Sequence, residues 1–191
     1  MPHLIDYQGI PLLFQEFVSL RALEHNLGRV IRVITSNYQS VGFKAEDHHI
    51  IAITIVNRRL RELPEEFTLF SKLQTFTSIN SRLKSLPESF GNLKSLQELH
   101  LYNTQLTSLP ESFGQLTNLK KLHLHKSYLR SLPETFEKLR NLEVLCLSRN
   151  KLRALPESFG DLTNLKELDL HKNQLTSLPE SLANLKSLQS L

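Results

Sequence analysis

Side chains capable of metal binding or acid–base chemistry recur in this chain at a common spacing. Four of its eight histidines and its single cysteine take part. They form one series with a step of 23 residues and a second series displaced by two residues: His100, His123, Cys146 and Asp169; Tyr102, His125 and His171. Imidazole, thiol and carboxylate groups bind transition metals and serve as general acids, bases or nucleophiles. Whether these groups meet depends on an element that repeats every 23 residues.

That element is visible as a sequence repeat. A Leu-Pro pair recurs six times, from Leu63-Pro64 to Leu178-Pro179, always 23 residues apart. Six full units follow, here called units one to six, at 50–72, 73–95, 96–118, 119–141, 142–164 and 165–187. A truncated seventh unit begins at Leu188. Unit six, LKELDLHKNQLTSLPESLANLKS, has the most regular pattern.

Each unit has the pattern of a short strand followed by a helical return. Its second and third leucines are two residues apart and therefore share one face of a strand. Proline suits the start of a helical turn, so P-E-S-F-G-N-L predicts a short helical or 3₁₀ segment on the convex side. One unit cannot bury its apolar face alone, whereas a stack of units can. The sequence therefore predicts an α/β fold, a right-handed parallel solenoid with a curved sheet.

The repeat resembles the pattern of leucine-rich repeat proteins, over about three quarters of the chain. The segment before it, GFKAEDHHIIAITIVNRRLRELPE, resembles cytoplasmic leucine-rich repeat proteins of archaea and bacteria. The resemblance implies recognition of another macromolecule on the concave sheet, with partners that range from small GTPases to host or signalling proteins. It implies a protein-interaction module and no enzyme.

Residues 1–49 do not repeat and are predicted to form an N-terminal cap of the repeat domain at 50–191. Apolar residues spaced three or four apart predict a helix over 11–28, closed by Gly28. Strands are predicted at 30–34 and 41–45, with a turn at 46–49 leading into a strand at 50–55. A solenoid needs a cap to cover the end of its core. A separate helical docking domain is the alternative.

The third, fifth, seventh and eighth positions of each unit are expected on the concave face. Units one and two place small and apolar groups there, whereas units three to six place charged groups and histidines. Tyr102 is the best anchor candidate, because aromatic residues dominate binding energy. The predicted binding residues are Thr77, Ile79, Glu98, His100, Tyr102, Lys121, His123, His125, Val144, Cys146, Arg149, Glu167, Asp169 and His171.

The histidines leave two further readings open. A His-x-His strand places two imidazoles ~7 Å apart on one side, so His100, His123, His125 and Cys146 are candidate zinc ligands. Their spacing matches no known metal motif, and no metal or cofactor is predicted. The same histidines would make the face pH-sensitive, gaining charge as the pH falls toward ~6. A metal-dependent or pH-dependent binder is therefore one alternative function.

Catalysis is not expected, because there is no Gly-rich phosphate loop and no independent Ser-His-Asp motif. Cys146 beside His123 imitates a Cys-His pair, but an open sheet without a pocket argues against that chemistry. The formal net charge is only +4 and its lysines and arginines are spread along the chain, so neither nucleic acid nor membrane is predicted as a partner. One cysteine and no signal-peptide pattern favour the cytoplasm.

Two irregularities predict where the solenoid is weak. The ninth position normally holds an asparagine whose side chain satisfies backbone hydrogen-bonding groups, and Asn150 and Asn173 fit this pattern. Arg58 cannot replace asparagine at all, and the hydroxyl residues at the other ninth positions can form fewer hydrogen bonds: Ser81, Thr104 and Ser127. Ser78 also stands where an apolar residue belongs, so units one to three are expected to be less stable than units five and six. The C-terminus lacks a cap, which predicts either a longer parent protein or a self-assembling structural protein that pairs through this open edge.

Overall fold

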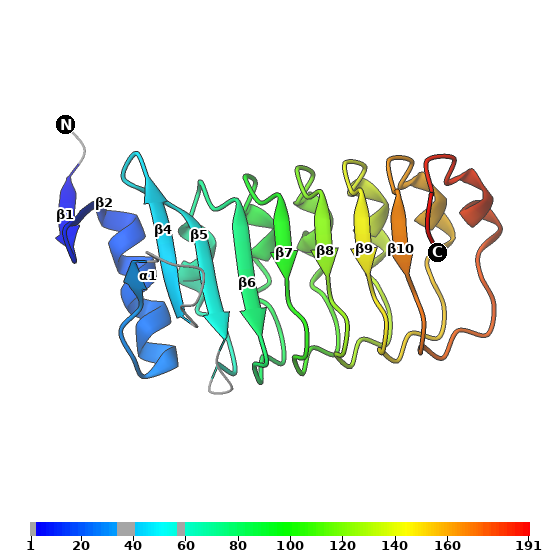
Figure 1. The fold of residues 1–191 in the computed structure, drawn as a ribbon, viewed down its shortest axis with the longest axis horizontal. Coiled ribbons are helices and arrows are strands. Elements are labelled where there is room, and N and C mark those ends of the chain that lie inside the picture. The colour runs from blue at the N-terminus through cyan, green and yellow to red at the C-terminus, as the bar shows by residue number, and fades with distance from the viewer. Residues whose placement is uncertain (1–2, 34–40, 57–59) are drawn as a thin grey trace.

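A computed structural model describes residues 3–33, 41–56 and 60–191 of the chain. Its main element is an eight-stranded sheet in the order β10-β9-β8-β7-β6-β5-β4-β3 (Figure 1). Six of these strands are consecutive and parallel, one for each unit: β5 (His49–Val56), β6 (Thr75–Ile79), β7 (Glu98–His100), β8 (Lys121–His123), β9 (Val144–Cys146) and β10 (Glu167–Asp169). The chain is therefore an α/β solenoid, as predicted.

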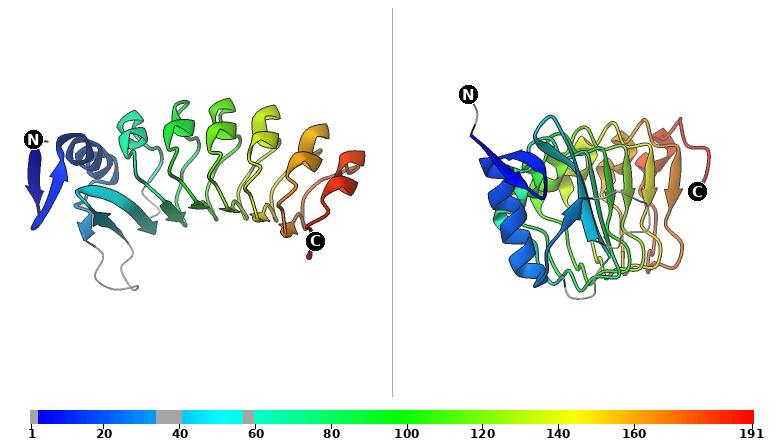
Figure 2. Two further views of the ribbon diagram at one scale, coloured as in Figure 1. Left: turned by 90° about the horizontal axis from the view of Figure 1, so that it is seen from above. Right: turned by 60° about the vertical axis from the view of Figure 1, so that its left-hand side comes forward.

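The register of the sheet follows the sequence period. Leu99 pairs with Leu122, and Leu122 pairs with Leu145, each 23 residues further along the chain. The unit boundaries derived from the Leu-Pro spacing therefore describe the turns of the solenoid. Figure 2 shows the strands along one side of the stack and the helical segments along the other.

The return segments are 3₁₀ helices, one in each unit: η1 (Glu65–Leu69), η2 (Phe90–Asn92), η3 (Glu111–Gln115), η4 (Glu134–Lys138), η5 (Glu157–Asp161) and η6 (Glu180–Asn184). All except η2 directly follow the proline of the Leu-Pro pair. The phenylalanines of units one to five stack in a buried column with ring centroids 6.2 to 6.4 Å apart. This column and the strand leucines fill the core.

The N-terminal segment contains a helix, as predicted, but starts with a hairpin that the sequence reasoning missed. Helix α1 (Phe14–Leu27) ends at Gly28, which has a left-handed φ of 61°. Residues 11–13, assigned to this helix, instead lie in β2 (Ile10–Leu13), which pairs antiparallel with β1 (Leu4–Tyr7). The turn between these strands places Gln8 and Gly9 at positive φ, which matches the twist of a two-residue hairpin.

The remaining strands of this segment join the solenoid sheet. β4 (Val41–Glu46) pairs antiparallel with β5 through a turn at Asp47 and His48, close to the predicted hairpin. β3 comprises only Arg32–Val33 and pairs parallel with β4. The strand expected at 30–34 therefore begins two residues later than predicted, and position 34 lies outside the described residues. The division into a cap and a repeat domain stays a prediction.

A buried carboxylate of α1 connects the helix to β1 and to the segment just before β3. The buried Glu24 carboxylate accepts hydrogen bonds from the Tyr7 hydroxyl and, at 2.7 Å, from the Ile31 amide. Burial, followed by the hydrogen bond to Glu24, raises the pKa of Tyr7 to about 12. No described helix is long and apolar enough to cross a membrane.

The ninth positions behave as the residue types predict. The Asn150 amide donates to the carbonyls of Leu124 and Leu147 at 2.9 and 2.8 Å and accepts from the Leu129 amide at 3.1 Å. Asn173 makes the corresponding three bonds one unit later. By contrast, the buried hydroxyls of Ser78 and Ser81 have no partner in the described part of the chain. The lower stability of units one to three stays a prediction that this difference supports.

Candidate functional site

The concave face is formed by the strand positions that alternate with the buried leucines. Leu99, Leu122 and Leu145 are fully buried, while the residues on either side of each are at least partly exposed. The fifth-position row pairs in register along the sheet: Thr77, His100, His123, Cys146 and Asp169. The third-position row does the same: Thr75, Glu98, Lys121, Val144 and Glu167. The predicted alignment of His100, His123 and Cys146 is confirmed.

Four rings gather where β7 and β8 meet, and they are called the ring cluster here: His100, Tyr102, His123 and His125. His100 stacks on His123 with centroids 4.8 Å apart, and Tyr102 stacks on His125 at 4.6 Å. His123 and His125 contact edge to face at 6.5 Å. Successive strands lie ~4.8 Å apart, so equal residue positions on neighbouring units bring flat rings into stacking distance.

The ring cluster is half-buried, and this determines its charge. Burial, then the proximity of His100 and His125, lowers the pKa of His123 to about 4. Burial also lowers the pKa of His125, followed by the effect of Lys126. Both imidazoles are therefore neutral at pH 7 and offer ring faces together with hydrogen-bonding nitrogens. The expectation that the histidines gain charge near pH 6 is wrong for His123, which needs a lower pH.

One ion pair and two contacts between a histidine and a carboxylate lie at or near the ring cluster. The Lys121 ammonium lies 2.8 Å from the Glu98 carboxylate and lowers the pKa of that group through a hydrogen bond. His100 approaches the same carboxylate at 3.5 Å. On β10 the His171 ring contacts Asp169 at 2.5 Å. The face thus combines neutral rings with charges of both signs, whereas Thr77 and Ile79 of unit two supply a less polar, half-buried area.

The seventh and eighth positions differ from the predicted rows in two respects. Ser148, expected on the concave face between His125 and His171, is buried with 4% of its surface exposed. The eighth-position residues are exposed and adopt left-handed φ values of 54° to 57°: Asn80, Asn103, Lys126, Arg149 and Lys172. The chain turns at this position, which directs the eighth residue to the rim of the sheet. The sequence prediction assigned this residue to the concave face because the repeat spacing alone does not reveal the turn.

Cys146 has the environment of an unreactive thiol. Burial, then the carboxylates of Asp169 and Glu167, raises the pKa of the Cys146 thiol. The thiolate needed for nucleophilic attack is therefore disfavoured. Within the described ranges no group of three or more His, Cys, Asp or Glu side chains is arranged to hold a metal ion. The candidate ligands His100, His123, His125 and Cys146 align, but as stacked neighbours and not as a coordination shell.

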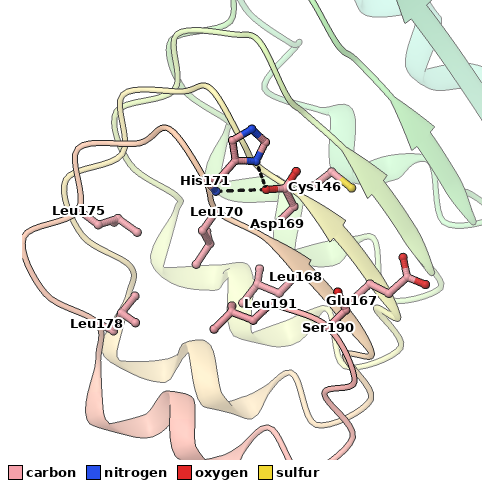
Figure 3. Close-up of a pocket in the computed structure, with 10 residues that line it drawn as sticks. All are labelled: Cys146, Glu167, Leu168, Asp169, Leu170, His171, Leu175, Leu178, Ser190 and Leu191. Carbon is pink, nitrogen blue, oxygen red and sulfur yellow. Dashed lines mark hydrogen bonds and ion pairs between the residues drawn. The ribbon is translucent and has the colours of Figure 1, made fainter.

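A pocket of about 590 Å³ lies at the C-terminal end of the stack (Figure 3). Its apolar floor comes from leucines of unit six and the residues after it: Leu168, Leu170, Leu175, Leu178 and Leu191. Cys146, Asp169 and His171 lie along its concave side. In earlier units the equivalent leucines are covered by the next turn. The expectation of a sheet without a pocket is therefore wrong at this end, although the lining is the uncovered core of the solenoid.

Comparison with known proteins agrees with the architecture. A family model described as "Leucine-rich repeat region" matches residues 111–191, and one described as "Leucine rich repeat" matches residues 73–129. No curated protein matches the chain. A leucine-rich repeat protein of Leptospira interrogans is 35% identical, with 72% of this chain and 41% of that chain covered and a TM-score of 0.58.

Two further solved structures are similar over a comparable share of the chain. The leucine-rich repeat domain of the type III effector XopL is 28% identical, with 74% of this chain and 51% of that chain covered and a TM-score of 0.67. The plant peptide hormone receptor RGFR1, solved in complex with RGF2, is 30% identical, with 73% and 27% covered and a TM-score of 0.59. The chain therefore spans about half or less of the length of each of these proteins.

The parallel sheet, the 3₁₀ returns and the 23-residue register define the class of repeat solenoids that present one exposed sheet face. The matched family models identify the class more closely, and the chain belongs to the leucine-rich repeat family. Domains of this family are typically non-enzymatic protein-interaction modules.

Proposed function

We propose that this chain is a non-enzymatic interaction module that binds a protein or peptide partner on the concave face, with the ring cluster at the centre of the contact. The observation that carries the proposal is the stacking of His100 on His123 and of Tyr102 on His125. Stacked rings hold each other in place, so a partner would find a preorganised surface and would order few side chains on binding. Aromatic residues near an interface centre supply most of the binding energy.

The composition of the face supports a protein ligand. Neutral rings are flanked by the Glu98–Lys121 ion pair, which offers both a donor and an acceptor to a partner's side chains or backbone. The half-buried Thr77 and Ile79 continue the face toward β6 and offer apolar contact. A structurally similar plant peptide hormone receptor was solved in complex with RGF2, which supports a peptide-like ligand for this chain.

The test is affinity capture from the source organism with the wild-type chain and two variants. Tyr102→Ala combined with His123→Ala removes one ring from each stacked pair and is expected to abolish capture of the partner. Phe14→Ala combined with His25→Ala is the matched control, because it removes one aromatic ring and one imidazole that are exposed on α1, outside the ring cluster. Equal capture by all three proteins, with unchanged circular dichroism, would reject the concave face as the binding surface.

The alternatives predict different outcomes in the same assay. A metal-dependent binder would lose capture on addition of a chelator, but the described residues offer no coordination shell in its support. If the chain self-associates through the C-terminal edge, removal of residues 188–191 should lower the mass of the particle measured by light scattering. A cytoplasmic location stays a prediction from the single cysteine.

A further inference from the structure

Six of the 23 lysines and arginines of the chain lie on one edge of the solenoid. They lie in the segments that follow the strands of units four to six. Together these six exposed cations are called the basic rim here: Lys126, Arg130, Arg149, Lys151, Arg153 and Lys172. They stand at the eighth, tenth and twelfth positions, so a 23-residue step separates equivalent members. The edge is the lower one in Figure 1, toward which the parallel strands point.

Backbone hydrogen bonds hold these segments against one another. The amide of Lys126 donates to the Ser148 carbonyl at 3.0 Å, and the amide of Arg149 donates to the His171 carbonyl at 2.9 Å. Further along the rim, Lys151 donates to the Leu129 carbonyl at 2.8 Å. The six side chains therefore extend from neighbouring turns whose backbones are hydrogen-bonded to one another.

Within the described ranges, no carboxylate forms an ion pair with the basic rim. No carboxylate stands at positions eight to thirteen of units four to six. None of the six cations forms an ion pair with a described residue, although Lys121 and Lys166 elsewhere on the solenoid do. The Lys151 ammonium instead lies over the Tyr128 ring, 4.9 Å from its centroid. Like charges on adjacent turns repel one another, so folding alone gives no reason for this arrangement.

The backbone supplies a second, independent cost at the same place. Lys126, Arg149 and Lys172 adopt φ values of 55° to 57°, a conformation that suits glycine or asparagine better. Units two and three place Asn80 and Asn103 at this position. Backbone strain of this kind clusters at functional sites, so the three cations in left-handed turns point to a role beyond folding.

We infer that the basic rim binds an acidic segment of the protein partner whose docking on the ring cluster is proposed above, on which this inference rests. The two surfaces adjoin, because Lys126 and Arg149 are close enough to His125 to influence its pKa. An anionic polymer long enough to cover both the rim and the concave face fits less well, since Glu98, Glu167 and Asp169 on the concave face would repel it. A polypeptide can place carboxylates on the rim and cations opposite these three acids.

The rim is tested separately with a fluorescein-labelled poly-L-glutamate peptide and a single-stranded oligodeoxythymidine of matched charge. Fluorescence anisotropy is measured at low and at physiological ionic strength. The rim variant combines Arg130→Gln, Lys151→Gln and Arg153→Gln, leaving the left-handed positions intact. The matched control combines Lys138→Gln, Arg140→Gln and Lys186→Gln, which removes three exposed cations away from the rim. Thermal melting checks that both variants fold.

The wild-type chain and the control are expected to bind the peptide, and the rim variant to bind it about tenfold more weakly, since exposed ion pairs are individually weak. Salt should weaken the binding of all three proteins. The inference is overturned if the peptide does not bind, if the control loses as much affinity as the rim variant, or if the oligonucleotide binds more tightly through the rim. Tyr102→Ala with His123→Ala should retain peptide binding, so failure of the rim and failure of the ring cluster are distinguishable.

Discussion

The difference between Ser81 and Asn150 gives the sharpest test of what stabilises this solenoid. Asn150 makes three hydrogen bonds to backbone groups of 2.8 to 3.1 Å, whereas the Ser81 hydroxyl is buried without a described partner. The turn is alike at both sites, because the preceding residues Asn80 and Arg149 have φ values of 54° and 57°. Ser81→Asn should therefore reproduce the bonds, donating to the carbonyls of Ile55 and Ser78 and accepting from the Leu60 amide.

The expected gain follows from those bonds. Each intramolecular hydrogen bond contributes roughly 0.5–1.5 kcal/mol net, and a buried unsatisfied hydroxyl costs about 1–3 kcal/mol. Ordering the larger side chain offsets part of this, so we expect Ser81→Asn to raise the free energy of unfolding by about 1–2 kcal/mol. The reverse change, Asn150→Ser, should lower it by about 2–4 kcal/mol, because it leaves three buried backbone groups unpaired.

Urea unfolding measures the global change, and native-state hydrogen exchange shows where it occurs. Protection should rise in units one to three for Ser81→Asn. Asn118→Ser is the control, since Asn118 is exposed and makes a single bond of 2.8 Å to the Lys94 carbonyl. A stability unchanged by Ser81→Asn and by Asn150→Ser would refute the reasoning that ninth-position bonds stabilise each turn.

Three further predictions concern the ring cluster, the rim and the convex side. Because the pKa of His123 is about 4 in the folded chain, the unfolded chain takes up this proton first as the pH falls. The free energy of unfolding should then decrease from about pH 6.5 to 4, and His123→Gln should make that decrease shallower in urea titrations across this range. Lys126→Asn should raise the melting temperature, corresponding to roughly 0.5–1 kcal/mol, by relieving the strain at a φ of 56°; a lower melting temperature would contradict this. Gly91→Ala would place a Cβ 2.0 Å from the Ser112 carbonyl oxygen, so calorimetry should show a loss of about 1–3 kcal/mol.

The solenoid could be predicted from the sequence because one pattern is written six times. The Leu-Pro spacing gives the register, and the leucines two residues apart give the buried strand face. The β1–β2 hairpin was missed because it occurs once and its apolar residues also fit a helical spacing. Its signal was the Gln8-Gly9 pair, where glycine permits the positive φ of a tight turn.

The candidate site was predictable in its rows but not in its chemistry. Equal positions in successive units must be neighbours, so the alignment of His100 with His123 follows from the period alone. The stacking and the lowered pKa of His123 depend on how far each ring is buried, which a single sequence does not specify. The burial of Ser148 depends on the same local packing.

The distribution of charge on the surface differs from the impression that the sequence gives. Lysines and arginines separated by about 20 residues look dispersed along the chain, and for an ordinary globular fold this would argue against a charged binding surface. A 23-residue period brings them to one edge, where Arg130 and Arg153 occupy the same position on adjacent turns. The charge distribution of a repeat protein therefore has to be judged along the repeat positions and not along the chain.

The alternation of buried and exposed residues along each strand separates the positions that stabilise the solenoid from the positions available for recognition. In β8, Leu122 is fully buried, whereas Lys121 is exposed on one side of it and His123 is partly exposed on the other. Changes to the leucine, asparagine and phenylalanine positions act on the stack, while changes to the outward positions act on the surface. Since the strands are only three residues long in units three to six, the scaffold constrains few side chains in each unit. The concave face and the rim can therefore acquire the charge and ring pattern of a particular partner without altering the register that aligns them.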